Sequence, residues 1–185
     1  PEEFRGINPG PAEPRGRCGS AYLLPPCAKN LEESKDYPMS EKIYETNLGS
    51  IHYWTWGAMD GQDITLVFLP GLTADHRLFE KQVQHFAGKC NVLVWDPPGH
   101  GASWPFDLTF HLADQATWLE AILERENVAQ PVIVGQSMGG YVGQAYAQLY
   151  PRRLKGFIAI DSAPLQRRYV TAMEIWLLKR MGPVY

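Results

Sequence analysis

The chain has 185 residues, of which 45% are hydrophobic and 20% are charged, and its formal net charge is -3 at pH 7. This composition is typical of one globular domain with enough apolar residues to form a core, and it excludes disorder as the class of the whole chain. Lys and Arg are scattered and no apolar run approaches the roughly 20 residues of a membrane span, so we expect neither nucleic acid nor a membrane as a partner.

Residues 1–38 differ from the rest of the chain. They are rich in Pro, Gly, Arg and Glu and show neither a period of 2 nor a period of 3.6, so we predict a disordered leader. The chain begins with Pro1, whereas Met39 opens the first patterned segment. Our hypothesis is that Met39 is the natural start and that residues 1–38 derive from upstream DNA.

Targeting and metal signals are missing from the sequence. The apolar run 21–24 is cut short by Pro25 and Pro26, so no secretory signal is expected and the default compartment is the cytoplasm. The three cysteines, Cys18, Cys27 and Cys90, are odd in number and lack metal-ligand spacing. We therefore predict neither a disulfide framework nor a metal site, and no cofactor.

From Met39 the apolar pattern becomes regular. We predict strands at 42–48, 51–56, 64–69, 92–95, 131–134 and 156–160, and helices at 78–86, 112–124 and 141–149. The first two strands form an antiparallel hairpin around Asn47 and Gly49, and the continuous apolar runs 64–69 and 156–160 indicate buried strands. Strands that alternate with helices imply a mostly parallel sheet, hence a three-layer α/β sandwich with its reactive loops at the carboxyl ends of the strands.

Ser137 lies in a G-x-S-x-G motif directly after an apolar strand and directly before a helix. A serine in this position is typical of a nucleophile elbow, a tight turn that pushes the hydroxyl out of the sheet in a strained conformation with positive φ. Gly135 and Gly139 lack the Cβ atoms that would collide in the turn, and Gly140 allows a close approach of the helix. The sequence therefore predicts that Ser137 is a catalytic nucleophile.

Two further motifs accompany the elbow: the run 69–72 (Leu-Pro-Gly-Leu) after the third strand and the run 96–103 (Asp-Pro-Pro-Gly-His-Gly-Ala-Ser) after the fourth. With these motifs, residues 42–163 resemble the α/β-hydrolase family, in its serine-nucleophile esterase and lipase-like branch. The resemblance implies an oxyanion hole made by the backbone N–H groups of Leu72 and Met138. It also implies that Trp104 and Phe106 are possible pocket-lining residues, with ordinary packing as an equal alternative.

The histidines of the chain are weak candidates for a catalytic base. The resemblance implies that His100 is architectural and that Asp96 orders a loop, and His76, close to Leu72, is the least unlikely base. In this fold the triad follows the order Ser, acid, His, yet no histidine follows His111. Asp161 and Glu174 are the carboxylates downstream of Ser137, and neither replaces a histidine.

We therefore expect a fold truncated before its last strands, with a hydrolase core at 39–165 and the start of a helical cap, or an ordinary crossover helix, at 166–185. The leading function is hydrolysis of a small-molecule carboxylic ester, or another acyl substrate, through an acyl-enzyme at Ser137. In this chain the triad acid and histidine are missing, so the fragment itself is expected to have weak activity or none. The alternative is a non-catalytic α/β domain that binds a ligand or a partner. Lipase, perhydrolase, carbon–carbon hydrolase and acyltransferase activities share these motifs, and the sequence indicates no oligomeric state.

Overall fold

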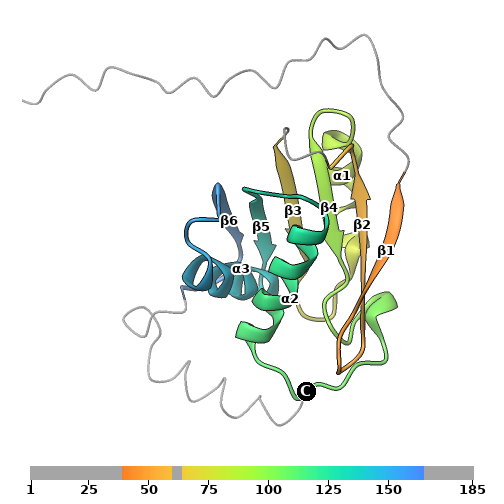
Figure 1. Cartoon of the computed structure of the whole chain (residues 1–185), viewed down its shortest axis with the longest axis vertical. Helices are drawn as coiled ribbons and strands as arrows, with labels where there is room; N and C mark the ends of the chain where they lie inside the picture. Colours follow the sequence, from red (N-terminus) through yellow and green to blue (C-terminus); the bar gives the residue numbers. More distant parts are fainter. Residues whose placement is uncertain (1–38, 60–63, 165–185) are drawn as a thin grey trace, which may run out of the picture.

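The computed structural model describes residues 39–59 and 64–164 (Figure 1). Within these ranges six strands form one sheet in the order β1-β2-β4-β3-β5-β6. The strands are β1 (Ser40–Glu45), β2 (Ser50–Trp56), β3 (Thr65–Leu69), β4 (Asn91–Trp95), β5 (Val132–Gln136) and β6 (Gly156–Ile160). β2 pairs antiparallel with β1 and β4, and the other pairs are parallel. The predicted mostly parallel α/β sheet is confirmed.

Helices cover both faces of this sheet (Figure 1). They are η1 (His76–Phe79), α1 (Glu80–Phe86), η2 (Gly101–Ser103), α2 (Leu112–Arg125) and α3 (Met138–Leu149). Because successive side chains of a strand point to opposite faces, neighbouring residues enter two separate cores. Val67, Leu93 and Ile133 pack with the buried residues of α2 and α3, whereas Phe68, Val94 and Val134 pack with Phe79 of η1 and Val83 of α1. The three layers are therefore helix, sheet, helix.

The β1–β2 hairpin is confirmed, but β1 lies earlier than the predicted strand 42–48. It ends at Glu45, which pairs with Ser50. The reason is Thr46, whose hydroxyl accepts hydrogen bonds from the N–H groups of Leu48 (3.0 Å) and Gly49 (3.1 Å). A threonine side chain that bonds its own turn competes with the strand ladder, so residues 46–49 form the turn.

The prediction of a buried strand at 156–160 is wrong for part of β6. Its position in the sequence is as predicted, but Ile158 is 51% and Ile160 is 41% exposed. Within the described residues β6 pairs only with β5. Phe157 packs in the core of α2 and α3, and the described helices leave the other face of β6 uncovered.

The loops after β3, β4, β5 and β6 share one edge of the sheet, because these strands are parallel. The chain leaves β3 toward α1 on one face and leaves β5 toward α3 on the opposite face (Figure 1). Adjacent strands whose connections diverge in this way define a topological switch point, where open α/β sheets bind ligands. The carboxyl ends of β3 and β5 therefore frame the most favourable site.

None of the helices in the described ranges has the length and apolar character that crossing a membrane requires. The predicted helix at 166–185, the leader at 1–38 and Glu174 lie outside the described residues.

Candidate active site

Ser137 occupies the turn between β5 and α3 and is partly exposed. Its φ is 50° and its ψ is -114°, which confirms the predicted positive φ. The N–H of Ser137 donates to the carbonyl of Ile160 (2.9 Å), and its own carbonyl accepts from the N–H of Gly140 (3.0 Å). A non-glycine residue in such a sparsely populated conformation persists when its surroundings fix it, and such residues cluster at functional sites.

The glycines beside Ser137 are required by close backbone contacts. A Cβ added to Gly135 would lie 2.6 Å from the backbone nitrogen of Gly140, and one added to Gly139 would lie 2.7 Å from the carbonyl oxygen of Pro70. Real Cβ atoms do not approach backbone so closely. The first turn of α3 therefore packs directly against the end of β3, as the predicted elbow requires.

The loop after β3 lies beside Ser137. A Cβ added to Gly71 would lie 3.1 Å from the Cβ of Ser137, so the neighbouring Leu72 belongs to the same site. The carbonyl of Gly71 accepts from the N–H of Ala74 (3.2 Å), which closes a tight turn with Thr73 at φ 65°. Met138 is the first residue of α3, and the first N–H groups of a helix have no acceptor inside it. The structure thus brings together the segments that carry both predicted oxyanion donors.

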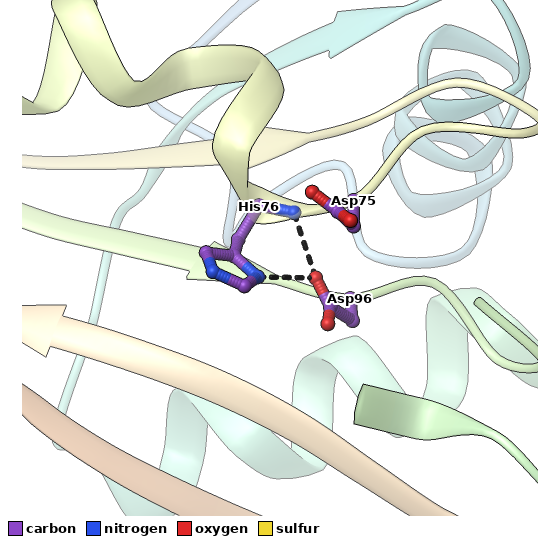
Figure 2. Close-up of side chains that lie close together, drawn as sticks. All are labelled: Asp75, His76 and Asp96. Atoms are coloured by element: carbon purple, nitrogen blue, oxygen red, sulfur yellow. Dashed lines mark hydrogen bonds and ion pairs between the residues drawn. The ribbon is translucent and has the colours of Figure 1, made fainter. Parts of the chain in front are cut away.

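Asp96 follows β4 and is fully buried. Its carboxylate accepts hydrogen bonds from the backbone N–H of His76 (2.7 Å) and from the N–H of Ala102 (2.7 Å), and it lies 2.8 Å from Nδ1 of His76. Figure 2 shows the imidazole and the carboxylate pointing toward each other. Asp96 therefore joins the loop after β3 to the loop after β4, as predicted for a residue that orders a loop.

Asp75, His76 and Asp96 are the one group of His, Cys, Asp and Glu in the described ranges whose ligand atoms could hold a metal ion, since these atoms lie within 4.8 Å of one another (Figure 2). Both carboxylates already accept hydrogen bonds from protein donors. Asp75 accepts from the N–H of Arg77 (3.0 Å) and pairs with its guanidinium, which lowers the pKa of Asp75. We interpret the group as a hydrogen-bonded cluster that fixes the start of η1.

His76 lies away from the elbow. Its ring stacks on Trp54 of β2 with 3.8 Å between ring centroids. β4 and β3 separate β2 from β5, which places the two strands about 14 Å apart at the usual spacing. His76, which the sequence favoured over the other histidines as a base, therefore pairs with Asp96 and not with Ser137.

The other histidines also have partners elsewhere. Nδ1 of His100 lies 3.1 Å from the carbonyl of Pro98 inside its own loop, in line with an architectural role. The ring of His52 pairs with Glu41 (3.0 Å), that of His85 lies 3.2 Å from Nζ of Lys89, and His111 caps α2. In the part of the chain that the structure describes, no histidine ring hydrogen-bonds to Ser137.

The two predicted pocket residues differ in exposure. Trp104 is 65% exposed, whereas Phe106 is 7% exposed. The ring of Phe106 packs edge-on against Phe110 and Trp118, with centroids 5.6 and 5.5 Å away. This packing favours the alternative of an ordinary core residue for Phe106.

One contact of the elbow was missed in the sequence. Ser162 follows β6, and its hydroxyl donates to the carbonyl of Ser137 over 2.6 Å. The local pattern of residues 156–162 does not predict this bond, because the bond depends on β6 lying beside β5. Asp161, the acid at the end of this strand, is exposed and has a φ of 50°.

The fold and the elbow together define the class of protein. Residues 64–179 match the family model described as alpha/beta hydrolase fold, and the chain belongs to this family. The fold-level expectation from the sequence is thereby confirmed.

Individual relatives share a minor part of their length with this chain. It is 29% identical over 114 residues to 3-oxoadipate enol-lactonase 2 of Acinetobacter baylyi, covering 62% of this chain and 42% of the relative. It is 28% identical over 130 residues to 1-acylglycerol-3-phosphate O-acyltransferase of Arabidopsis thaliana, covering 68% of this chain and 31% of the relative. Among solved structures, Est816, an N-acyl homoserine lactone degrading enzyme, has a TM-score of 0.60 and 26% identity over 65% of this chain and 45% of its own. The chain thus spans less than half the length of these proteins.

Proposed function

We propose that this chain carries the nucleophile of a serine hydrolase that cleaves a small-molecule carboxylic ester through an acyl-enzyme at Ser137. The observation that carries the proposal is the strained Ser137 at the topological switch point, so close to the loop after β3 that a Cβ added to Gly71 would lie only 3.1 Å from the Cβ of Ser137. The lactonases among the similar proteins, named for cyclic esters, support the substrate class.

In the proposed reaction Ser137 Oγ attacks the ester carbonyl carbon. A new C–O bond forms, the hydroxyl proton passes to a base, and the carbonyl oxygen becomes an oxyanion that the N–H groups of Leu72 and Met138 stabilise. The collapse of this intermediate breaks the bond to the alcohol, which leaves with a proton. Water then hydrolyses the acyl-enzyme by the same steps, and each donor contributes about 3 kcal/mol to such catalysis in comparable sites.

We further propose that the acid and histidine of the triad come from residues outside this sequence. Every histidine of the chain precedes Ser137, whereas this fold places the catalytic histidine after its nucleophile. The rings of His76 and His100 also have partners other than Ser137, namely Asp96 and the carbonyl of Pro98. The chain by itself is then a hydrolase core with a nucleophile, an oxyanion hole and no base.

A non-catalytic binding domain is the second candidate. It is favoured by one observation, that no histidine ring in the described ranges hydrogen-bonds to Ser137. Acyl transfer to an alcohol, as in the name of the Arabidopsis relative, needs the same acyl-enzyme and differs only in the acceptor.

Labelling with an alkyl fluorophosphonate separates these candidates. We expect one adduct, on Ser137, that forms slowly. The rate of labelling should rise with pH and show no plateau near pH 7, because hydroxide acts as the base in place of the missing imidazole. Ser137→Ala should abolish the adduct, and added free imidazole should accelerate labelling of the wild-type chain. A folded chain that remains unlabelled at every pH supports the binding domain, and a plateau with an apparent pKa near 6.5 would show that a histidine within this chain acts as the base.

A further inference from the structure

Ser162 holds the peptide group that carries one of the proposed oxyanion donors. The Ser162 hydroxyl donates to the carbonyl oxygen of Ser137 over 2.6 Å. This carbonyl belongs to the same peptide group as the N–H of Met138. Because a peptide group is planar and trans, its C=O and N–H point in opposite directions. A bond that fixes the oxygen therefore also fixes the direction of the N–H.

The elbow has space for this hydroxyl because residue 140 is glycine. A Cβ added to Gly140 would collide with Oγ of Ser162 and would lie 2.6 Å from its Cβ. The segment after β6 is also tied to α3, since the side-chain amide of Gln144 donates to the carbonyl of Ala163 (3.0 Å). The backbone that carries Ser162 is thus anchored to α3 one residue beyond it.

Residues at the carboxyl end of β6 hydrogen-bond to both polar groups of the Ser137 backbone. The N–H of Ser137 donates to the carbonyl of Ile160 (2.9 Å), and the carbonyl of Ser137 accepts from the hydroxyl of Ser162. These two bonds restrain φ and ψ of a residue whose conformation is sparsely populated. A hydrogen bond to the carbonyl also polarises the peptide group and strengthens its N–H as a donor.

We propose that Ser162 is a positioning residue, which aims the Met138 N–H at the reacting oxygen and holds Ser137 in its exposed conformation. This inference rests on the proposed function. It makes the end of β6 part of the catalytic apparatus, although Ser162 itself touches no reacting atom.

A thiol at position 137 tests the inference without a histidine or a substrate. In the full chain carrying Ser137→Cys, the pH dependence of alkylation by iodoacetamide, followed at the peptide containing position 137, gives the pKa of that thiol. The first turn of α3 should hold this pKa below the ordinary value of about 8.5. If Ser162 orients this turn, adding Ser162→Val should raise the thiol pKa and slow alkylation at pH 7 about fivefold.

The matched variant is Ser162→Thr, which has the shape of valine and retains the hydroxyl, and it should restore the rate to within about twofold. Ser50→Ala, which removes an exposed hydroxyl bonded to Glu45 (2.7 Å), should change nothing. Should Ser162→Val unfold the chain, Ser162→Ala provides the comparison. Equal thiol pKa values with and without the hydroxyl would overturn the inference. A thiol that responds to Ser162 in a chain whose Ser137 never reacts with fluorophosphonate would instead leave the positioning role intact and refute the proposed function.

Discussion

Replacing Asp96 by asparagine should destabilise the chain strongly, although the two side chains have nearly the same shape. The fully buried carboxylate accepts two backbone N–H groups and lies 2.8 Å from Nδ1 of His76. An amide has one acceptor oxygen, so its NH₂ group must face an N–H donor from either His76 or Ala102. The loss of one charge-assisted hydrogen bond and the buried donor left behind together cost about 3 kcal/mol.

Thermal unfolding followed by circular dichroism measures this effect. For a chain of this size, 3 kcal/mol lowers the melting temperature by about 6–12 °C. Asp107→Asn is the matched control, since Asp107 is exposed and accepts from the N–H of Thr109 over 3.1 Å, and it should shift the melting temperature by less than about 2 °C. If Asp96→Asn melts within 2 °C of the wild-type chain, the loop-ordering role of Asp96 is refuted.

Two further predictions concern the elbow and the helix behind it. Gly139→Ala places a Cβ against the carbonyl oxygens of Leu69 and Pro70 and should lower the free energy of unfolding, measured by chemical denaturation, by about 3 kcal/mol. In the control Gly156→Ala the nearest atom to the new Cβ is a methyl carbon of Val132 at 3.7 Å, so this variant should be neutral or stabilised by about 0.5 kcal/mol. Equal effects of the two substitutions would contradict the close packing of the elbow. Burial, followed by the hydrogen bond to Glu120 (2.6 Å), raises the pKa of Tyr146 far above its ordinary value of 10.0, so its contribution to stability is complete below pH 10 and is lost as the pH rises further. The melting temperature should therefore fall more between pH 9 and pH 11 in the wild-type chain than in Tyr146→Phe, and parallel losses would contradict this assignment.

The elements of the fold could be predicted from the sequence because each is encoded locally. The apolar runs of β3 and β5 and the helical spacing of α2 predicted the right elements, and the G-x-S-x-G motif between strand and helix predicted the positive φ of Ser137. The bounds of β1 were wrong because one side chain, Thr46, ends the ladder through its own turn. Such a bond competes with the strand and leaves no trace in the apolar period.

Contacts that join separate elements could not be predicted. Ser162 meets Ser137 only because β6 pairs with β5, and the 2.8 Å contact between His76 and Asp96 depends on β3 and β4 being neighbours. The exposure of Ile158 follows from the arrangement of helices over the sheet, whereas its apolar run alone indicates burial. The turn and its serine could thus be predicted from the sequence, whereas the residues that hold them could be found only in the structure.

The most direct test of the proposed acyl-enzyme at Ser137 is to trap it. If the chain lacks a base for attack, as proposed, it also lacks one for deacylation, so an acyl group transferred from p-nitrophenyl butyrate at pH 8.5 should accumulate on the chain with release of p-nitrophenolate. Mass spectrometry of the digested protein should place a single butyryl group on Ser137, and Ser137→Ala should lack it. Butyrylation of lysines alone, or equal butyrylation of the wild-type and Ser137→Ala chains, would contradict the account.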